Sequence, residues 1–177
     1  MKTKNLTLCA VFTALLCILS IITIPIGTIP ITLSTLAVML CGVILGAKKG
    51  LVSVILYILT GMVGIPVFSG LRGGFQVVLG PTGGFILGYI PMVIVIGLLT
   101  SRLPQKKLPK ILSVSGACFL GVIICYAFGT LYFMHLQHVG FYQAALVCVV
   151  PFIPFDILKS LFTGYITQKL TYLIQAR

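Results

Sequence analysis

Two residues of opposite charge stand three positions apart in an apolar segment near the end of the sequence. Asp156 is the only acidic residue among the 177, and Lys159 follows it within the segment Pro151–Lys159. Positions i and i+3 of a helix share one face, so the two side chains can form an ion pair. Inside a membrane helix each charge costs about 2.5–3.5 kcal/mol on insertion scales unless it is paired or solvated. The pair indicates either a salt bridge that only stabilises packing or a binding site, in which the carboxylate accepts N–H groups and the ammonium holds an anion.

Two prolines precede the charged pair. Pro151 and Pro154 lack the backbone N–H that a helix interior needs, and their rings clash with the preceding turn. We expect the helix to kink or break at this point and to free carbonyl groups near the charges.

The composition is typical of a membrane protein. Hydrophobic residues make up 59% and charged residues 7% of the chain, and the mean hydropathy is +1.23, whereas a soluble domain has about 25% charged residues. Disorder is excluded because it needs low hydrophobicity and high charge. The apolar runs are too continuous for the alternating strands of an outer-membrane barrel. We expect an all-α, polytopic protein of the cell membrane, in which residues 1–177 form a single domain within the lipid bilayer.

Loops divide the chain into six predicted membrane spans. They cover approximately residues 6–24, 33–47, 51–63, 84–100, 111–133 and 142–168. With the N-terminus in the cytoplasm, every Lys and Arg except Arg72 and Lys159 lies on the cytoplasmic side, as the positive-inside rule requires. Both termini are then cytoplasmic. The second and third spans are short for a hydrocarbon core of about 30 Å, so a re-entrant hairpin is an alternative there.

Residues that could catalyse a reaction or hold a metal are scarce. The sequence has no GxxxxGKS or GxxxxGKT, HExxH or GxSxG motif, and one carboxylate cannot support paired-carboxylate catalysis. We therefore expect no enzymatic activity. The six cysteines lie within predicted spans, and His135 and His138 lack a third ligand, so no metal and no cofactor are expected. The basic residues form separate clusters rather than one face, which argues against binding of nucleic acid.

Two connections on the predicted outer side are apolar where a solvent-exposed loop would be polar. The first is broken by Pro25, Gly27 and Pro30 and is predicted to be a lid over a cavity, although a loop that only dips into the membrane interface would look similar. The second ends in Gly80–Gly84, directly before a helix. Backbone N–H groups at Thr82, Gly83 and Gly84, at the positive end of that helix, are candidates to hold an anionic or carbonyl group.

Small residues four positions apart let membrane helices approach closely. Ala10 and Ala14 form such a pair in the first span. Packing within the chain is the ordinary interpretation of such a pair, which is a weak signal on its own.

Four motifs, taken together and in order, resemble the BioY family, the biotin-specific S components of energy-coupling-factor vitamin transporters. The motifs are Ile29–Gly42, Gly61–Phe68, Leu79–Phe85 and Pro154–Lys159, and the resemblance extends from the first span through the sixth. It implies a fold of six helices that binds biotin near the extracellular side. It also implies docking on a transmembrane coupling protein and two cytoplasmic ATPase subunits, which supply the energy.

The resemblance assigns roles to particular residues. The acid–lysine pair of the last helix corresponds to Asp156 and Lys159, and an alanine motif that faces the coupling protein corresponds to Ala10 and Ala14. Thr35, within the first motif, is a further candidate contact.

The chain also departs from the family pattern. Many members have Gln where this chain has Ser34 and Tyr where it has Phe85. Ser34 and Phe85 therefore leave open whether the polar contacts expected at those two positions are made, and Tyr89 or Gln76 could provide them instead.

Biotin suits these residues chemically. Its ureido N–H groups can donate to Asp156, and Lys159 can neutralise its carboxylate or polarise a carbonyl. The sequence leaves open which end of biotin meets which charge. It also leaves two rival functions open, namely a solitary carrier of biotin or a related vitamin that works without the ATPase module, and a purely structural membrane protein.

Overall fold

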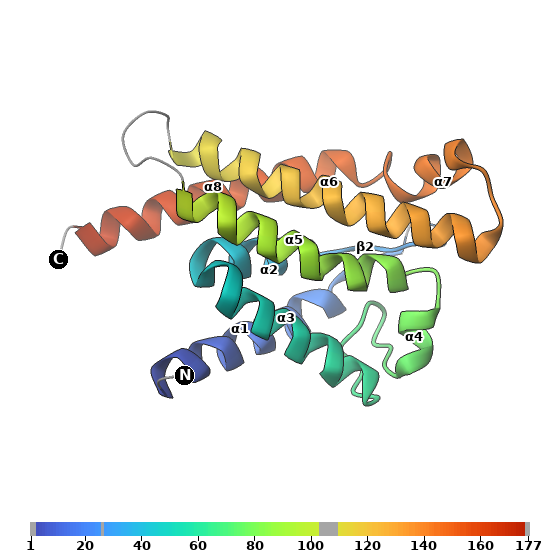
Figure 1. Cartoon of the computed structure of the whole chain (residues 1–177), viewed down its shortest axis with the longest axis horizontal. Coiled ribbons are helices and arrows are strands. Elements are labelled where there is room, and N and C mark those ends of the chain that lie inside the picture. The colour runs from blue at the N-terminus through green and yellow to red at the C-terminus, as the bar shows by residue number, and fades with distance from the viewer. Residues whose placement is uncertain (1–2, 26, 103–109, 176–177) are drawn as a thin grey trace.

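The apolar segments form helices because a backbone in lipid must satisfy its hydrogen bonds internally. The computed structural model describes residues 3–25, 27–102 and 110–175 (Figure 1). The helices are α1 (Thr3–Ile21), α2 (Ser34–Leu40), the π-helix η1 (Cys41–Leu45), α3 (Gly46–Met62), α4 (Phe75–Leu79), α5 (Gly83–Arg102), α6 (Lys110–Gln137), α7 (Phe141–Cys148) and α8 (Ile153–Gln175). Strands β1 (Thr23–Ile24) and β2 (Ile31–Thr32) pair antiparallel between α1 and α2, with Thr23 opposite Thr32.

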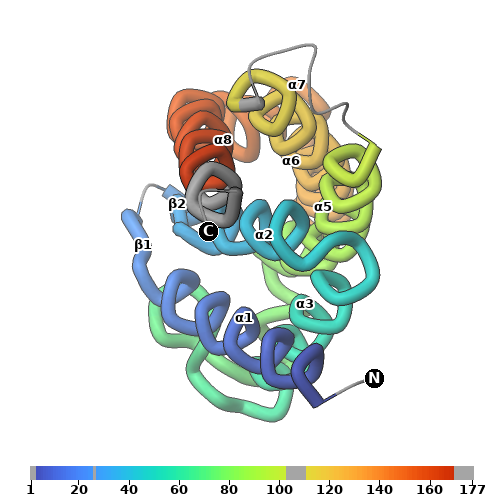
Figure 2. The backbone as a smooth tube through the Cα atoms, turned by 90° about the vertical axis from the view of Figure 1, so that its left-hand side faces the viewer, coloured from blue at the N-terminus to red at the C-terminus, as the bar shows by residue number. Residues whose placement is uncertain are grey.

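The short helix α2 lies in the interior of the bundle. All its residues except Thr35 are buried. Around it, α5 packs against α6 and α3, α6 against α8, and α1 against α2 and α3 (Figure 2). The β1–β2 hairpin leads directly into α2, whose start therefore lies in the middle of the molecule. There α2 is also in contact with α8.

Close helix contact depends on glycine where η1 and α3 cross α5. A Cβ atom at Gly97 would clash with the backbone nitrogen of Ala47, and one at Gly42 would lie 2.7 Å from the Ile96 side chain. The hydrophobic effect does not drive helix association in lipid. Small residues at such crossings let the backbones approach closely, so that van der Waals contacts hold the helices together.

The predicted sidedness of the loops agrees with the arrangement of the helices. The start of α1, the turn between α2 and α3, the end of α5, the start of α6 and the end of α8 all lie at one end of the molecule (Figure 1). The loop before α4 and the link from α6 to α7 lie at the other end. The predicted cytoplasmic cations Lys2, Lys106, Lys107 and Arg177 lie outside the described residues. Which end faces the cytoplasm stays a prediction from the charges.

The predicted count of six membrane-spanning helices is not confirmed by the length and hydropathy of the helices. Within the described residues, four helical runs are long and apolar enough to cross a membrane: Thr3–Ile21, Ser34–Met62, Gly83–Arg102 and Ile111–Gln137. The bent pair α7 and α8 makes a fifth if it counts as one span. The predicted second and third spans correspond to α2–η1 and α3, which follow one another without a loop and are separated by a turn at Gly46, where φ is 76° and ψ is 174°. Only glycine adopts this conformation readily, so the chain turns there without a separate loop.

Two outer segments predicted as loops also contain regular structure. The first connection forms the β1–β2 hairpin, and the second contains the single turn of helix α4. Both segments are apolar enough to pack against the bundle, so their backbone groups must find partners within the protein.

Candidate substrate-binding site

The helix break predicted at the two prolines is confirmed. α7 and α8 meet at an angle of 48°, and Pro151 lies in the break between them. Pro154 is the second residue of α8, where a missing N–H costs little because the first turn has no intrahelical acceptor for it. Asp156 consequently lies in the first turn of α8. There the positive end of the helix dipole stabilises its carboxylate.

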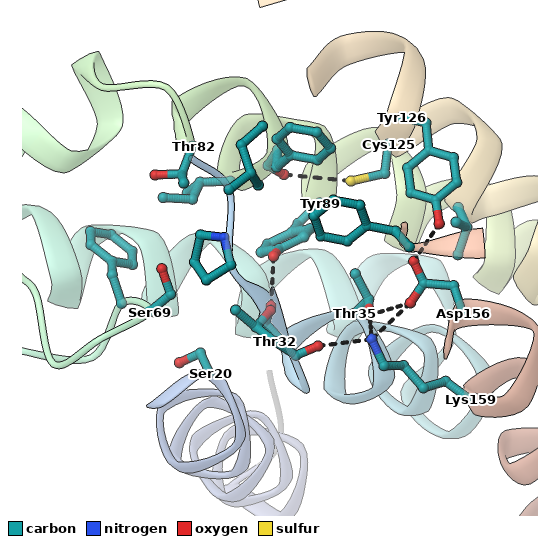
Figure 3. Close-up of a pocket in the computed structure, with 18 of the residues that line it drawn as sticks. Ser20, Thr32, Thr35, Ser69, Thr82, Tyr89, Cys125, Tyr126, Asp156 and Lys159 are labelled. Carbon is teal, nitrogen blue, oxygen red and sulfur yellow. Dashed lines mark hydrogen bonds and ion pairs between the residues drawn. The ribbon is translucent and has the colours of Figure 1, made fainter. Parts of the chain in front are cut away.

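Asp156 is buried, and three side chains from three other positions meet at its carboxylate. Its Oδ1 accepts hydrogen bonds from Lys159 Nζ at 2.8 Å and from Thr35 Oγ1 at 2.9 Å (Figure 3). Its Oδ2 accepts one from the Tyr126 hydroxyl at 2.6 Å. A carboxylate offers about four lone-pair sites, so Oδ2 retains capacity for a further donor.

Lys159 is equally well satisfied. Its ammonium donates to Asp156 Oδ1, to Thr35 Oγ1 at 2.9 Å and to the carbonyl oxygen of Thr32 at 2.8 Å. These three acceptors use all three of its protons. The predicted ion pair between Asp156 and Lys159 is therefore confirmed, and it is tied to β2 and α2 as well.

Two members of this cluster, Tyr126 and the carbonyl of Thr32, were not predicted. Tyr126 stands in the middle of a span without charged residues, and its contact with Asp156 bridges 30 residues of chain. Thr35, predicted as a contact of the ligand, is hydrogen-bonded to both Asp156 and Lys159.

A second polar chain lies beside the first. The Tyr89 hydroxyl and Ser34 Oγ are 2.6 Å apart, and Ser34 also bonds to the hydroxyl of Thr32. Tyr89 and Gln76 were the residues expected to replace polar contacts at positions 34 and 85, and Tyr89 is the one that lies next to Ser34. Gln76 lines a separate hollow.

A cavity joins these polar groups, and we call it the inner cavity. It has a volume of about 50 Å³ and is lined on its apolar sides by aromatic rings. Phe85 and Phe152 stack with ring centroids 6.3 Å apart, and Tyr57 meets Phe68 edge to face at 5.5 Å. Asp156, Lys159, Tyr126 and Tyr89 supply polar groups to the same space.

A larger hollow, the outer vestibule, lies next to the inner cavity. It has a volume of about 680 Å³, and its lining includes Pro25, Gly27, Arg72 and Gln76. Pro30, Ser69 and Thr82 line both spaces, and we call these three residues the neck. Figure 3 places Ser69 and Thr82 across the cavity from Asp156.

The predicted loop residues thus divide between the two spaces. Pro25, Gly27 and Gln76 line the vestibule, and Pro30 and Thr82 line the neck. Gly83 and Gly84 are buried but line neither space. A Cβ atom at Gly83 would clash with the Val78 carbonyl oxygen, and one at Gly84 would clash with Tyr132 Cβ. These two glycines therefore allow close packing at the start of α5.

Ala10 and Ala14 are exposed on α1. Packing within the chain, the ordinary interpretation of this pair, does not account for them. Among the described residues, no group of three or more His, Cys, Asp or Glu side chains is placed to hold a metal.

Comparison with known proteins agrees with this geometry. Residues 1–176 match the sequence model of the BioY family. The chain belongs to the BioY family. Two relatives named biotin transporter BioY, from Rhodobacter capsulatus and Thermotoga maritima, are each 37% identical to it. The alignments cover 94% of this chain in both cases, and 93% and 95% of the relatives.

A solved structure shows the same fold as this BioY-family chain. It is the crystal structure of the S component for biotin from an ECF-type ABC transporter, and it matches with a TM-score of 0.87 at 29% identity. The match covers 97% of this chain and 92% of the solved one. The S-component fold and a multi-pass membrane location, both predicted from the sequence, are therefore confirmed.

Proposed function

We propose that the chain is the biotin-binding S component of an energy-coupling-factor transporter, which captures biotin outside the cell. The observation that carries this proposal is the buried Asp156–Lys159 pair at one side of an aromatic-lined cavity. The names of the relatives and the likeness to a solved S component for biotin support biotin as the ligand. The same names describe transporters, in line with a role other than catalysis.

Asp156 is the proposed acceptor for a ureido N–H of biotin. Oδ2 carries one hydrogen bond, from Tyr126, and has room for a second. Lys159 balances the negative charge of Asp156, and it contacts a ligand oxygen only by giving up one of its three protein acceptors. The rings of Phe85 and Phe152 suit the apolar thiophane and valeryl parts of the ligand.

The loop from Pro25 to Pro30 is the proposed lid. Pockets for small molecules usually enclose roughly 300–1,000 Å³, whereas the inner cavity has about 50 Å³. Biotin therefore needs the lid, the neck or both to move before it can reach Asp156. Pro30 links the lid to both spaces, so movement of the lid changes the width of the neck.

The proposed partners are a transmembrane coupling protein and two cytoplasmic ATPase subunits. Exposed alanines at Ala10 and Ala14 leave a smooth strip on α1, against which another helix can pack closely. A solitary carrier is the alternative function, because it would need the same pocket without the ATPases. Biotin uptake in cells that lack the coupling module separates the two functions.

Thermal unfolding of the purified protein in detergent tests the proposal. A ligand that binds only the folded state stabilises it by about 2.7 kcal/mol at one hundred times its Kd. We expect biotin, within a panel of vitamins, to raise Tm, and Asp156→Asn and Lys159→Ala to reduce the increase. A protein that biotin does not stabilise would contradict the proposal, and unchanged affinity in both variants would contradict the assigned site.

A further inference from the structure

The outer vestibule contains one charged side chain among the described residues that line it, and this is Arg72. In the sequence, Arg72 stands alone between Lys49 and Arg102 as the only Lys or Arg. The one carboxylate side chain of the protein, on Asp156, is buried and paired with Lys159. The vestibule therefore presents a positive charge that no carboxylate side chain of this protein offsets.

The backbone around Arg72 is fixed, although its side chain is exposed. The Phe68 N–H donates to the Arg72 carbonyl oxygen at 2.9 Å, and the two residues form a β-bridge. Gly70 and Leu71, between them, have φ values of 70° and 56°, which close a tight turn. Phe68 is buried and anchors this turn to the bundle.

The guanidinium of Arg72 has no hydrogen bond or ion pair to any side chain or carbonyl in the part of the chain that the structure describes. A structural role in the loop would use the side chain, but here the backbone alone holds the turn. Arg72 lies at the wall of the vestibule, outside the neck. Its charge is therefore on the path from the vestibule to the inner cavity.

We propose that the outer vestibule is an encounter site for the carboxylate of the incoming ligand, in which Arg72 steers the anion toward the neck. This inference rests on the proposed function, because it takes biotin as the anionic ligand. A charged hollow with low-dielectric walls concentrates ions of opposite sign and raises the association rate. Arg72 lies outside the neck, so it acts on the approach of biotin and leaves the bound state at Asp156 unaffected.

The association rate is measured with radiolabelled biotin by rapid filtration, on protein in nanodiscs of zwitterionic phosphatidylcholine. Two opposite unit charges about 6 Å apart in water attract with an energy that corresponds to roughly a threefold change in rate. We expect Arg72→Gln to slow association of biotin about threefold at low salt and to leave the dissociation rate unchanged. The difference should disappear near 1 M salt, where the Debye length is about 3 Å.

A second ligand and two control variants distinguish an effect of the Arg72 charge from an effect of the size and shape of its side chain. Biotinamide has the same rings and chain without the carboxylate, so Arg72→Gln should leave its association rate unchanged. Arg72→Lys keeps the charge and should keep the wild-type rate for biotin. Arg102→Gln removes an exposed cation at the other end of the molecule and should have no effect.

The outcomes distinguish this inference from the proposed function. If the wild-type protein binds biotin but Arg72→Gln associates at the wild-type rate, or slows biotin and biotinamide equally, the encounter site is wrong and the proposed function stands. If the wild-type protein binds no biotin, the proposed function fails and the inference is overturned with it.

Discussion

Lys159 Nζ donates a 2.8 Å hydrogen bond to the carbonyl oxygen of Thr32, so the charged pair of α8 holds the strand that carries the lid. Thr32 ends β2, and β2 pairs with β1 on the other side of the loop from Pro25 to Pro30. The ammonium thus connects ligand-binding groups to the base of the lid. A change at Lys159 is expected to affect both the stability of the bundle and the closure of the cavity.

Variants of the Asp156–Lys159 pair are predicted to affect the stability of the protein and its affinity for biotin differently. Lys159→Met leaves the Asp156 carboxylate buried without a counter-ion, which typically destabilises by about 3–5 kcal/mol. The double variant Asp156→Asn with Lys159→Met removes both charges and should recover most of the lost Tm. Biotin affinity should remain low in the double variant, because the carboxylate acceptor is gone. Thermal unfolding and radioligand binding measure the two quantities.

Each alternative for the pair makes a different prediction in this experiment. If the double variant binds biotin as the wild type does, the pair is only a salt bridge that stabilises packing. If the double variant is as unstable as Lys159→Met, the destabilisation comes from the lost contacts to Thr32 and Thr35 and not from unbalanced charge.

Tyr126 is predicted to position the carboxylate of Asp156 for the ligand. Its hydroxyl donates to Oδ2 at 2.6 Å, and a hydrogen bond to a charged group contributes about 1.5–3 kcal/mol. Tyr126→Phe should therefore lower the free energy of unfolding by about that amount and weaken biotin binding, because Oδ2 loses the donor that orients it, while the protein still folds because the ring is retained. Tyr142→Phe is the matched control, since Tyr142 is 75% exposed on α7. Equal affinity in Tyr126→Phe and Tyr142→Phe would show that the Tyr126 hydroxyl does not contribute.

The glycine in the lid is predicted to control the release of biotin. Gly27 has a φ of 66°, and the space that a Cβ atom would occupy is open, so Gly27→Ala introduces backbone strain and no clash. A left-handed conformation costs an alanine about 1 kcal/mol, which should speed dissociation of biotin about fivefold. Gly140→Ala is the control, because Gly140 has equal space but a φ of −70°. Identical dissociation rates for the two variants would contradict a lid that closes in this conformation.

The membrane class, most helix positions and the charged pair were predictable because each leaves a local pattern. Apolar runs mark α1, α5 and α6, and the i, i+3 spacing places Asp156 beside Lys159. The break between the second and third spans was predicted at Lys48 and Lys49, because charged residues are typical of a loop. In the structure these lysines lie in the first turn of α3, and the turn is made at Gly46 instead.

The remaining parts of the site depend on contacts between distant segments. Tyr126 meets Asp156 across 30 residues, and the Thr32 carbonyl meets Lys159 across 127. A hydroxyl in an apolar span and a backbone carbonyl carry no pattern that distinguishes them from their neighbours. At positions 83 and 84 a pattern is present, but it has two meanings. A glycine-rich start of a helix suits both an anion site and close packing of helices.

The exposed alanines of α1 are predicted to serve transport and not binding. Ala10 is exposed and lines neither the inner cavity nor the vestibule, so Ala10→Trp should leave biotin affinity unchanged. If a coupling protein packs on this strip, the indole prevents close approach of its helix and biotin uptake in cells is lost. Val11→Trp is the control, because Val11 is 57% exposed on a neighbouring face of the same helix and should tolerate the indole in lipid. Uptake retained in Ala10→Trp would contradict docking through this strip, and loss of binding would instead place Ala10 in the packing of the fold.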